Sequence, residues 1–343
     1  MLKKLFALSL AVLMLLGCFT ACGNAEPAET TEPVVTESAE EAKVLKVLTL
    51  GHSLTVDTGH MLNMIAATQG FDAYEEVYIG TLYHSGCKLS QHVGFIRANA
   101  GEYNLYLSST ATPGEPPEIM HGVTMQQALT FNYWDIIVMQ GGPWEIDGEA
   151  AFENGNIQFI QEYVKENVAN PNFIFAWHMP WALPGDEALL KMYPYEPNSH
   201  YNNHLQRYNL DKSAHYEAQV SCVEKYIVPD ETFAFVIPSG TTIQNAWSSY
   251  LEEKDLHRDY AHASDLGRVM ASYTWYCMLL GIEQLDEIKL DAIPKAFLKS
   301  TADKSQDRPL TEAEKAIILE SVNNALKDPY HMTQSQYTEA PAQ

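Results

Sequence analysis

Five short apolar stretches, separated by helical patterns, limit the possible folds of this chain more than any other feature. Each stretch is rich in β-branched or aromatic residues, as buried strands are. Four of them run directly into glycine or proline. The stretches are 44–51, 76–83, 134–141, 173–179 and 233–240. Because strands that alternate with helices pair in parallel, the pattern predicts a three-layer α/β/α sandwich around a five-stranded parallel sheet.

Helix starts support this alternation. Two segments begin with a capping box, in which a threonine is followed three residues later by Gln or Glu: Thr124 with Gln127, and Thr311 with Glu314. Further helices are expected at 157–168, 213–226 and 264–280.

The first 22 residues have the form of a bacterial lipoprotein signal. Two lysines precede the apolar stretch 5–16, which is too short to span a bilayer as a mature helix. Cys18 and Cys22 follow, each directly after a small residue. We assign lipidation to Cys22, because a polar segment begins directly after it. Cys18 stays open as the alternative, and so does an ordinary secretory signal with incidental cysteines.

The rest of the chain divides by composition. Residues 23–43 are rich in Ala, Glu, Thr and Pro, and such a segment cannot bury enough surface to offset its ordering entropy. It is therefore predicted to be a flexible acidic linker. Residues 44–330 are long enough for one large α/β domain, and 331–343 are predicted to be a disordered tail.

Charge and cysteine usage argue against several classes of protein. The formal net charge of -23 disfavours nucleic acid as a partner. Beyond the signal, three cysteines remain without a close CxxC pair, which fits neither a disulfide framework nor a thiolate zinc site. His257, Asp259 and His262 are close in sequence, but no His-Glu-x-x-His or comparable ligand pair occurs. We expect no metal and no cofactor.

Polar or small residues follow the predicted strands. Ser53 follows the first strand, Gly86 the second and Gln140 ends the third, while Asp259 and His262 precede the last strong helix. A serine hydroxyl is a poor nucleophile until a base takes its proton. His262 can be that base, and Asp259, three residues earlier, can fix its tautomer. The alternative is structural: Ser53 and Asp259 cap helices, and His262 is a surface residue.

These residues resemble the sequence blocks of the SGNH (GDSL-like) hydrolases. Residues 51–54, Gly-His-Ser-Leu, resemble the first block, Gly-Asp-Ser; Gly86 matches the glycine of the second; and Asp259-x-x-His262 matches the last. A closer resemblance, over about 45–282, is to an SGNH-like domain family of largely uncharacterised bacterial secreted proteins and lipoproteins. Its blocks match residues 51–55, 134–137 with Gln140, and 237–241.

The resemblance implies a flavodoxin-like sheet and a serine esterase. Ser53 would be the nucleophile, His262 the base and Asp259 the residue that orients it. The oxyanion would be held by the backbone N–H groups of Gly86 and Ser53 and by Gln140, which stands where typical SGNH enzymes have asparagine.

The substrate is the least constrained part of the hypothesis. Aromatic residues gather over 177–207, and flat rings suit the apolar faces of sugars. Packing of a surface insertion explains them equally well. The residues predicted to bind substrate are Trp177, His178, Ser239 and Thr241. The hypothesis is an extracytoplasmic, lipid-anchored esterase that removes O-acetyl groups, from glycans in the first instance. The alternative is a glycan-binding lipoprotein that retains the fold without turnover.

Overall fold

The computed structural model describes residues 43–190, 200–294 and 308–341. The predicted signal segment with Cys22, and nearly all of the predicted linker, lie outside these residues. All the described residues belong to one folded unit. Within that unit, no helix is both long enough and apolar enough to cross a membrane.

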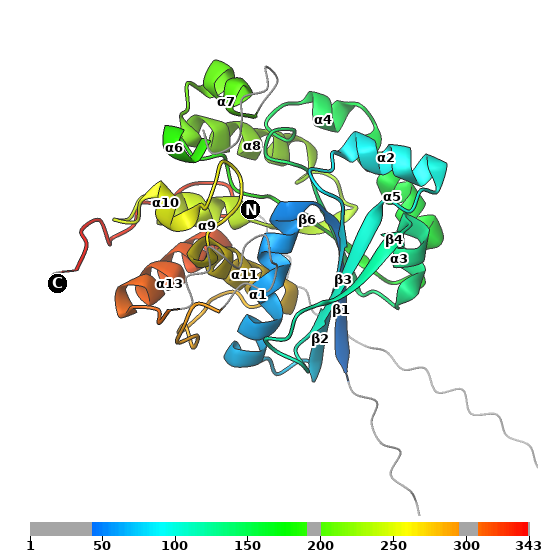
Figure 1. Ribbon diagram of the computed structural model, residues 1–343, viewed down its shortest axis with the longest axis horizontal. Coiled ribbons are helices and arrows are strands. Elements are labelled where there is room, and N and C mark those ends of the chain that lie inside the picture. The colour runs from blue at the N-terminus through cyan, green and yellow to red at the C-terminus, as the bar shows by residue number, and fades with distance from the viewer. Residues whose placement is uncertain (1–42, 191–199, 295–307, 342–343) are drawn as a thin grey trace, which may run out of the picture. The chain divides into compact units, whose positions relative to one another are not determined.

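A seven-stranded mixed sheet with strand order β4-β3-β2-β1-β5-β6-β7 forms the centre of the domain (Figure 1). In chain order the strands are β1 (Val44–Gly51), β2 (Glu76–Tyr83), β3 (Tyr103–Ser109), β4 (Glu118–Val123), β5 (Ile136–Gln140), β6 (Ile174–His178) and β7 (Phe233–Ile237). The five predicted strands are β1, β2, β5, β6 and β7, and they pair in parallel. Numbered among themselves they have the order 2-1-3-4-5 of flavodoxin-like sheets.

The prediction of a five-stranded, wholly parallel sheet is wrong, because β3 and β4 extend the sheet beyond β2 in antiparallel pairs. Strands buried on both faces are continuous apolar runs, whereas an antiparallel strand near an edge alternates. In β3, buried Tyr103, Leu105 and Leu107 alternate with half-buried residues, and β4 is mostly exposed and carries glutamate, histidine and glycine. Neither segment has the continuous apolar run by which the other five were identified.

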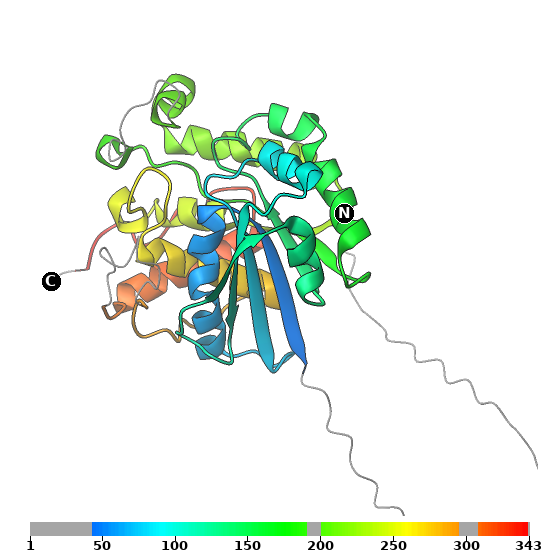
Figure 2. The same ribbon diagram turned by 45° about the vertical axis from the view of Figure 1, so that its right-hand side comes forward.

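Helices cover both faces of the sheet (Figure 2). Their bounds are α1 (Ser53–Gln69), α2 (Leu89–Ala98), α3 (Met125–Phe131), α4 (Ala150–Glu153), α5 (Asn156–Asn167), α6 (Glu187–Leu190), α7 (His200–Tyr208), α8 (Lys212–Tyr226), α9 (Ser239–Ala246), α10 (Glu253–Leu256), α11 (Asp265–Leu280) and α13 (Glu312–Lys327). On one face α1, α9 and α13 pack against α11, and on the other α2 and α3 pack against α5.

Local capping sets several of these helix starts, as predicted. Thr124 Oγ1 accepts a hydrogen bond from the Gln127 N–H at 3.2 Å, and Thr311 Oγ1 accepts from the Glu314 N–H at 3.1 Å. Nearly all the residues of α11 are buried, since α1, α9 and α13 all pack against it.

The prediction of a disordered tail is wrong for residues 331–341, which lie on the domain surface. The Thr333 N–H donates to Asn245 Oδ1 at 2.7 Å, and the Ser335 N–H donates to Ser248 Oγ at 2.8 Å. The carbonyl of Tyr337 accepts from the Tyr250 N–H at 2.9 Å. These contacts pair tail backbone with polar groups of the segment after β7, so the tail is ordered without an apolar pattern that the sequence could reveal.

Deleting residues 331–343 should therefore destabilise the domain. The deletion removes the three tail contacts just described, and a hydrogen bond of this kind contributes about 1 kcal/mol net. The free energy of unfolding should fall, and the urea concentration at the midpoint of unfolding should fall with it. Deletion of 340–343 alone, which leaves these contacts in place, is the control and should not change the midpoint. Equal midpoints for both deletions would contradict the packing described here.

Candidate active site

Ser53 is the first residue of α1 and lies at the topological switch point of the sheet. Strand β1 lies between β2 and β5, so the chain leaves β1 toward one side of the sheet and later returns on the other. Crevices at such points, outside the carboxyl ends of the strands, bind ligands in open α/β sheets. The Ser53 side chain is partly exposed and makes no hydrogen bond with any residue that the structure describes.

The turn from β1 into α1 is tight. A Cβ atom on Gly51 would lie 2.0 Å from Thr55 Oγ1, so a larger residue does not fit without a shift. His52 is the N-cap of the helix in an extended conformation, with φ of -132°. Because Ser53 begins the helix, its backbone N–H has no intrahelical partner and lies at the positive end of the helix dipole.

The structure brings Asp259 and His262 together as predicted. Both carboxylate oxygens of Asp259 lie 2.9 Å from His262 Nδ1. One of them also accepts from the backbone N–H groups of Ala261, at 3.0 Å, and of His262 itself, at 2.8 Å. Burial raises the pKa of Asp259, but these hydrogen bonds outweigh it and hold the pKa below its usual value. The Asp259 carboxylate is therefore ionised and fixes Nδ1 of the imidazole.

The loop that carries His262 lies against α1, the helix that begins at Ser53. His262 is close enough to His52, the residue before the serine, for its charge to lower the pKa of His52. The next residue, Ala263, donates its N–H to Asp57 Oδ2 at 3.1 Å, and Asp57 lies one turn along α1 from Ser53. The loop that carries the predicted base and orienting carboxylate is thus bonded to the helix that begins with the predicted nucleophile.

Gly86 lies in the turn after β2 and has a φ of +59°, in the left-handed region that favours glycine. The turn reaches the end of β1, since the His84 N–H donates to the Gly51 carbonyl at 3.4 Å. Gly86 is exposed, and its N–H makes no hydrogen bond with the described residues. It is therefore available to an external oxygen atom.

Gln140 is buried rather than open to solvent. Its Oε1 accepts from Thr55 Oγ1 at 2.7 Å and from His178 Nδ1 at 2.5 Å. Its Nε2 donates to His52 Nε2 at 2.9 Å. Burial lowers the pKa of His52 to about 3, so the ring is neutral and can accept this bond. The glutamine amide thus joins β5, β6 and the start of α1. In this network His52 accepts a hydrogen bond from Gln140, a role that the sequence did not suggest.

The four residues predicted to bind substrate, Trp177, His178, Ser239 and Thr241, are fully buried, and this prediction is wrong. Trp177 packs between Phe152 and Phe233, with ring centroids 6.1 and 5.6 Å away. Thr241 Oγ1 donates to the carbonyl of Pro329 at 2.5 Å. The prediction assumed open strand ends, but α9 begins directly after β7, and the chain near Pro329 covers it.

Trp144 is an aromatic residue at the site that the sequence analysis missed. Its ring lies 5.2 Å from that of His52, and it is partly exposed. A Cβ atom on Gly142 would lie 2.6 Å from the indole, so the glycine gives the ring room to fold over the end of β5. The consecutive glycines after Gln140 were the available signal.

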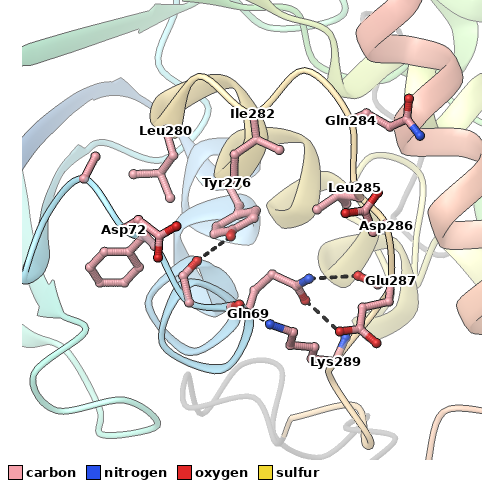
Figure 3. Close-up of a pocket in the computed structure, with 13 residues that line it drawn as sticks. Gln69, Asp72, Tyr276, Leu280, Ile282, Gln284, Leu285, Asp286, Glu287 and Lys289 are labelled. Atoms are coloured by element: carbon pink, nitrogen blue, oxygen red, sulfur yellow. Dashed lines mark hydrogen bonds between the residues drawn. The ribbon is translucent and has the colours of Figure 1, made fainter.

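A cavity of about 520 Å³ lies at the opposite end of α1 (Figure 3). Gln69 stands in it, donating to the Glu287 carbonyl at 2.8 Å and accepting from the Lys289 N–H at 3.1 Å. Gln69 is sixteen residues from Ser53, which corresponds to about 24 Å of helix. The cavity is therefore separate from the Ser53 site. Within the described ranges, no three His, Cys, Asp or Glu side chains are placed to hold a metal ion.

Comparison with known proteins places the chain in a family. A family model described as "Domain of unknown function (DUF4886)" matches residues 46–294. The chain belongs to this family. A solved DUF4886 protein from Bacteroides uniformis is 21% identical, and the match covers 86% of this chain and 100% of that one with a TM-score of 0.67. The DUF4886 relative therefore shares the fold.

A second solved structure is more distant. It is a protein from Slackia heliotrinireducens whose description proposes an SGNH hydrolase. It is 16% identical, and the match covers 68% of this chain and 97% of that one with a TM-score of 0.41, which is too low to support an argument. No curated protein matches this DUF4886 chain.

His257, at the edge of the site, should make the fold sensitive to acid. Its ring is buried between Trp247 and Trp181, with centroids 5.0 and 6.3 Å away, and neither ring nitrogen has a hydrogen-bond partner among the described residues. Burial lowers its pKa from 6.5 to about 3. Below pH 6.5 the unfolded chain takes up a proton that the folded chain does not, so stability falls as the pH falls toward 3.

His257→Phe should remove this contribution. Between pH 7 and pH 5 the free energy of unfolding of the wild type should fall by about 2 kcal/mol more than that of the variant. Urea unfolding at both pH values measures the difference. His331→Gln is the control: the hydrogen bond from His331 to exposed Asp328 raises the pKa of His331, so its contribution has the opposite sign. An equal fall in wild type and His257→Phe would contradict a neutral buried His257.

Proposed function

We propose that this DUF4886 protein is an SGNH-like serine esterase that acts through an acyl-enzyme. The observation that carries the proposal is the Asp259–His262 pair, with both carboxylate oxygens 2.9 Å from Nδ1, on a loop bonded to the helix that begins at Ser53. Ser53 Oγ attacks the ester carbonyl while His262 Nε2 takes its proton. His262 then protonates the leaving alkoxide, and water hydrolyses the acyl-enzyme by the same route.

Two backbone groups suit the developing oxyanion. The N–H of Ser53 lies at the start of α1, and the N–H of Gly86 lies on the neighbouring turn after β2. Preorganised donors of this kind are usually the largest single contribution to acyl transfer. Gln140 was predicted as a third donor. Its hydrogen bond to His52 supports a different role: Gln140 holds in place the residue that precedes the nucleophile.

The substrate we propose is an O-acetyl ester on a glycan. Trp144 supports this choice, because its partly exposed ring beside His52 offers a flat apolar surface next to Ser53. A net charge of -23 disfavours polyanionic substrates. The second candidate is a glycan-binding lipoprotein without turnover. It is favoured by one observation, that the Ser53 side chain makes no hydrogen bond to His262 among the described residues.

Labelling and kinetics separate these candidates. Wild-type protein should react with a fluorophosphonate probe, and Ser53→Ala should not. The same change should lower kcat on a small acetyl ester by at least about 10⁴-fold, as removal of a serine nucleophile does elsewhere. His262→Ala should be nearly as severe, and the double variant little worse, because the two residues act as a unit. Ser90→Ala, an exposed serine on α2, is the control. Turnover that survives Ser53→Ala would remove the serine mechanism.

We further propose that the protein is exported and anchored by a lipid on Cys22. The sequence form of the first 22 residues supports this. Cys22→Ser should release the protein from the membrane fraction, because the acyl chains have no other attachment point. Fractionation and immunoblotting measure this, with Cys18→Ser as the matched control that should stay membrane-bound. Release by Cys18→Ser alone would move the anchor to Cys18.

A further inference from the structure

A group of buried charges joins α1 to the loop that carries His262. Asp57 is 2% exposed, and both its oxygens lie 3.1 Å from Arg258 Nη1. Its Oδ1 also accepts from Arg268 Nε at 3.0 Å and Nη2 at 2.8 Å. Its Oδ2 accepts from the Ala263 N–H at 3.1 Å. One carboxylate thus binds two guanidinium groups and the backbone directly after His262.

Arg258 closes the same loop from inside. Its backbone N–H donates to the His262 carbonyl at 3.0 Å, and its Nη1 donates to the Ala263 carbonyl as well as to Asp57. Within the loop, the Asp259 carboxylate also accepts hydrogen bonds from the backbone N–H groups of Ala261 and His262. The base therefore lies in a short loop whose two ends meet at Arg258 and Asp57.

The charges in this group balance. Arg268 Nη1 also donates to Asp265 at 2.7 Å, so two carboxylates face two guanidinium groups. Burial raises the pKa of Asp57, but the positive charges of Arg268 and Arg258 outweigh it and hold the pKa well below its usual range. Buried ion pairs of this type add little net stability over apolar packing of the same volume. Stability alone therefore does not explain why these charges are buried here. Their position beside the loop of His262 suggests that they hold this loop in place.

We infer that Asp57 and Arg258 are positioning residues that set the spacing between Ser53 and His262. This inference rests on the proposed function. Ser53 and Asp57 are four residues apart on α1 and therefore share one face of the helix. Asp57 holds Ala263, the residue next to the base. Since Ser53 and His262 make no direct hydrogen bond among the described residues, this ionic link is what fixes their separation.

Substitution of Arg258 tests the inference. Asp57 still pairs with Arg268 in such a variant, so no unpaired charge is left buried and the domain should fold. Arg258→Gln should lower kcat on a small acetyl ester by about 10²-fold, the usual effect of a displacement near 1 Å, with little change in KM. The rate of fluorophosphonate labelling should fall in parallel. Hydrogen exchange at the Ala263 amide should become faster, while the amides of α1 and α11 stay protected.

Arg258→Lys is the rescue variant. All the side-chain contacts of Arg258 just described come from one nitrogen, Nη1, and a lysine ammonium can replace it with a single nitrogen that has three N–H donors. It should restore kcat to within about tenfold of wild type and slow the exchange again. Arg308→Gln is the matched control, since Arg308 pairs with Glu314 on α13 and makes no hydrogen bond or ion pair with the described residues of the site. It should leave kcat unchanged.

Each result decides between the alternatives. Unchanged kcat in Arg258→Gln, despite faster exchange at Ala263, would overturn the positioning role and leave the proposed function intact. If Arg258→Gln and Arg258→Lys both fold and lower kcat equally, the positive charge at position 258 is not what links the loop to Asp57. If the wild type shows neither turnover nor labelling, the proposed function fails, and exchange at Ala263 still shows whether Arg258 holds the loop. If Arg258→Gln does not fold, kcat and exchange of Arg258→Lys are compared with wild type, and a change in exchange without one in kcat overturns the inference.

Discussion

The contact between Gly51 and Thr55 is the constraint on which the site depends. Because Gly51 has no Cβ, the first turn of α1 lies directly on the end of β1, and Thr55 reaches Gln140 on β5. The same turn places Ser53 at the helix start and Asp57 one turn further on, facing the loop of His262. A larger residue at Gly51 would move all three side chains relative to β5 at once.

Two different environments meet at Ser53. Toward the sheet the neighbours are neutral: burial lowers the pKa of His52 to about 3 and the pKa of His178 well below 6.5. Toward α11 the neighbours are the ionised Asp57 with its two arginines. His262 lies between them with 18% of its side chain exposed, unlike the buried histidines. A histidine that exchanges protons with a substrate must reach solvent, and the partial exposure of His262 agrees with the role of base that we propose for it.

The parts of this structure that the sequence predicts are those that depend on neighbours along the chain. Strands β1 and β2 are short, mostly apolar runs and have the predicted bounds. The Asp259–His262 pair is also local, since three residues and one turn bring the groups together. By contrast, Asp57 finds Arg258 and Arg268 across about 200 residues of chain. No local pattern marks such partners, and the same holds for the tail that pairs with Asn245 and Ser248.

The buried strand ends also bear on where the proposed esterase would contact its substrate. After β6 and β7 the chain folds over its own strand ends, so His178 and Ser239 are inaccessible although they follow the same pattern as Ser53. Among the described strand ends, those of β2 and β5 are followed by an exposed glycine, Gly86, and a partly exposed tryptophan, Trp144. In the esterase that we propose, a substrate at Ser53 would contact the loops after β2 and β5 and the loop of His262. Differences in substrate among DUF4886 proteins should then reside in these three loops, because the remaining strand ends contribute to the core.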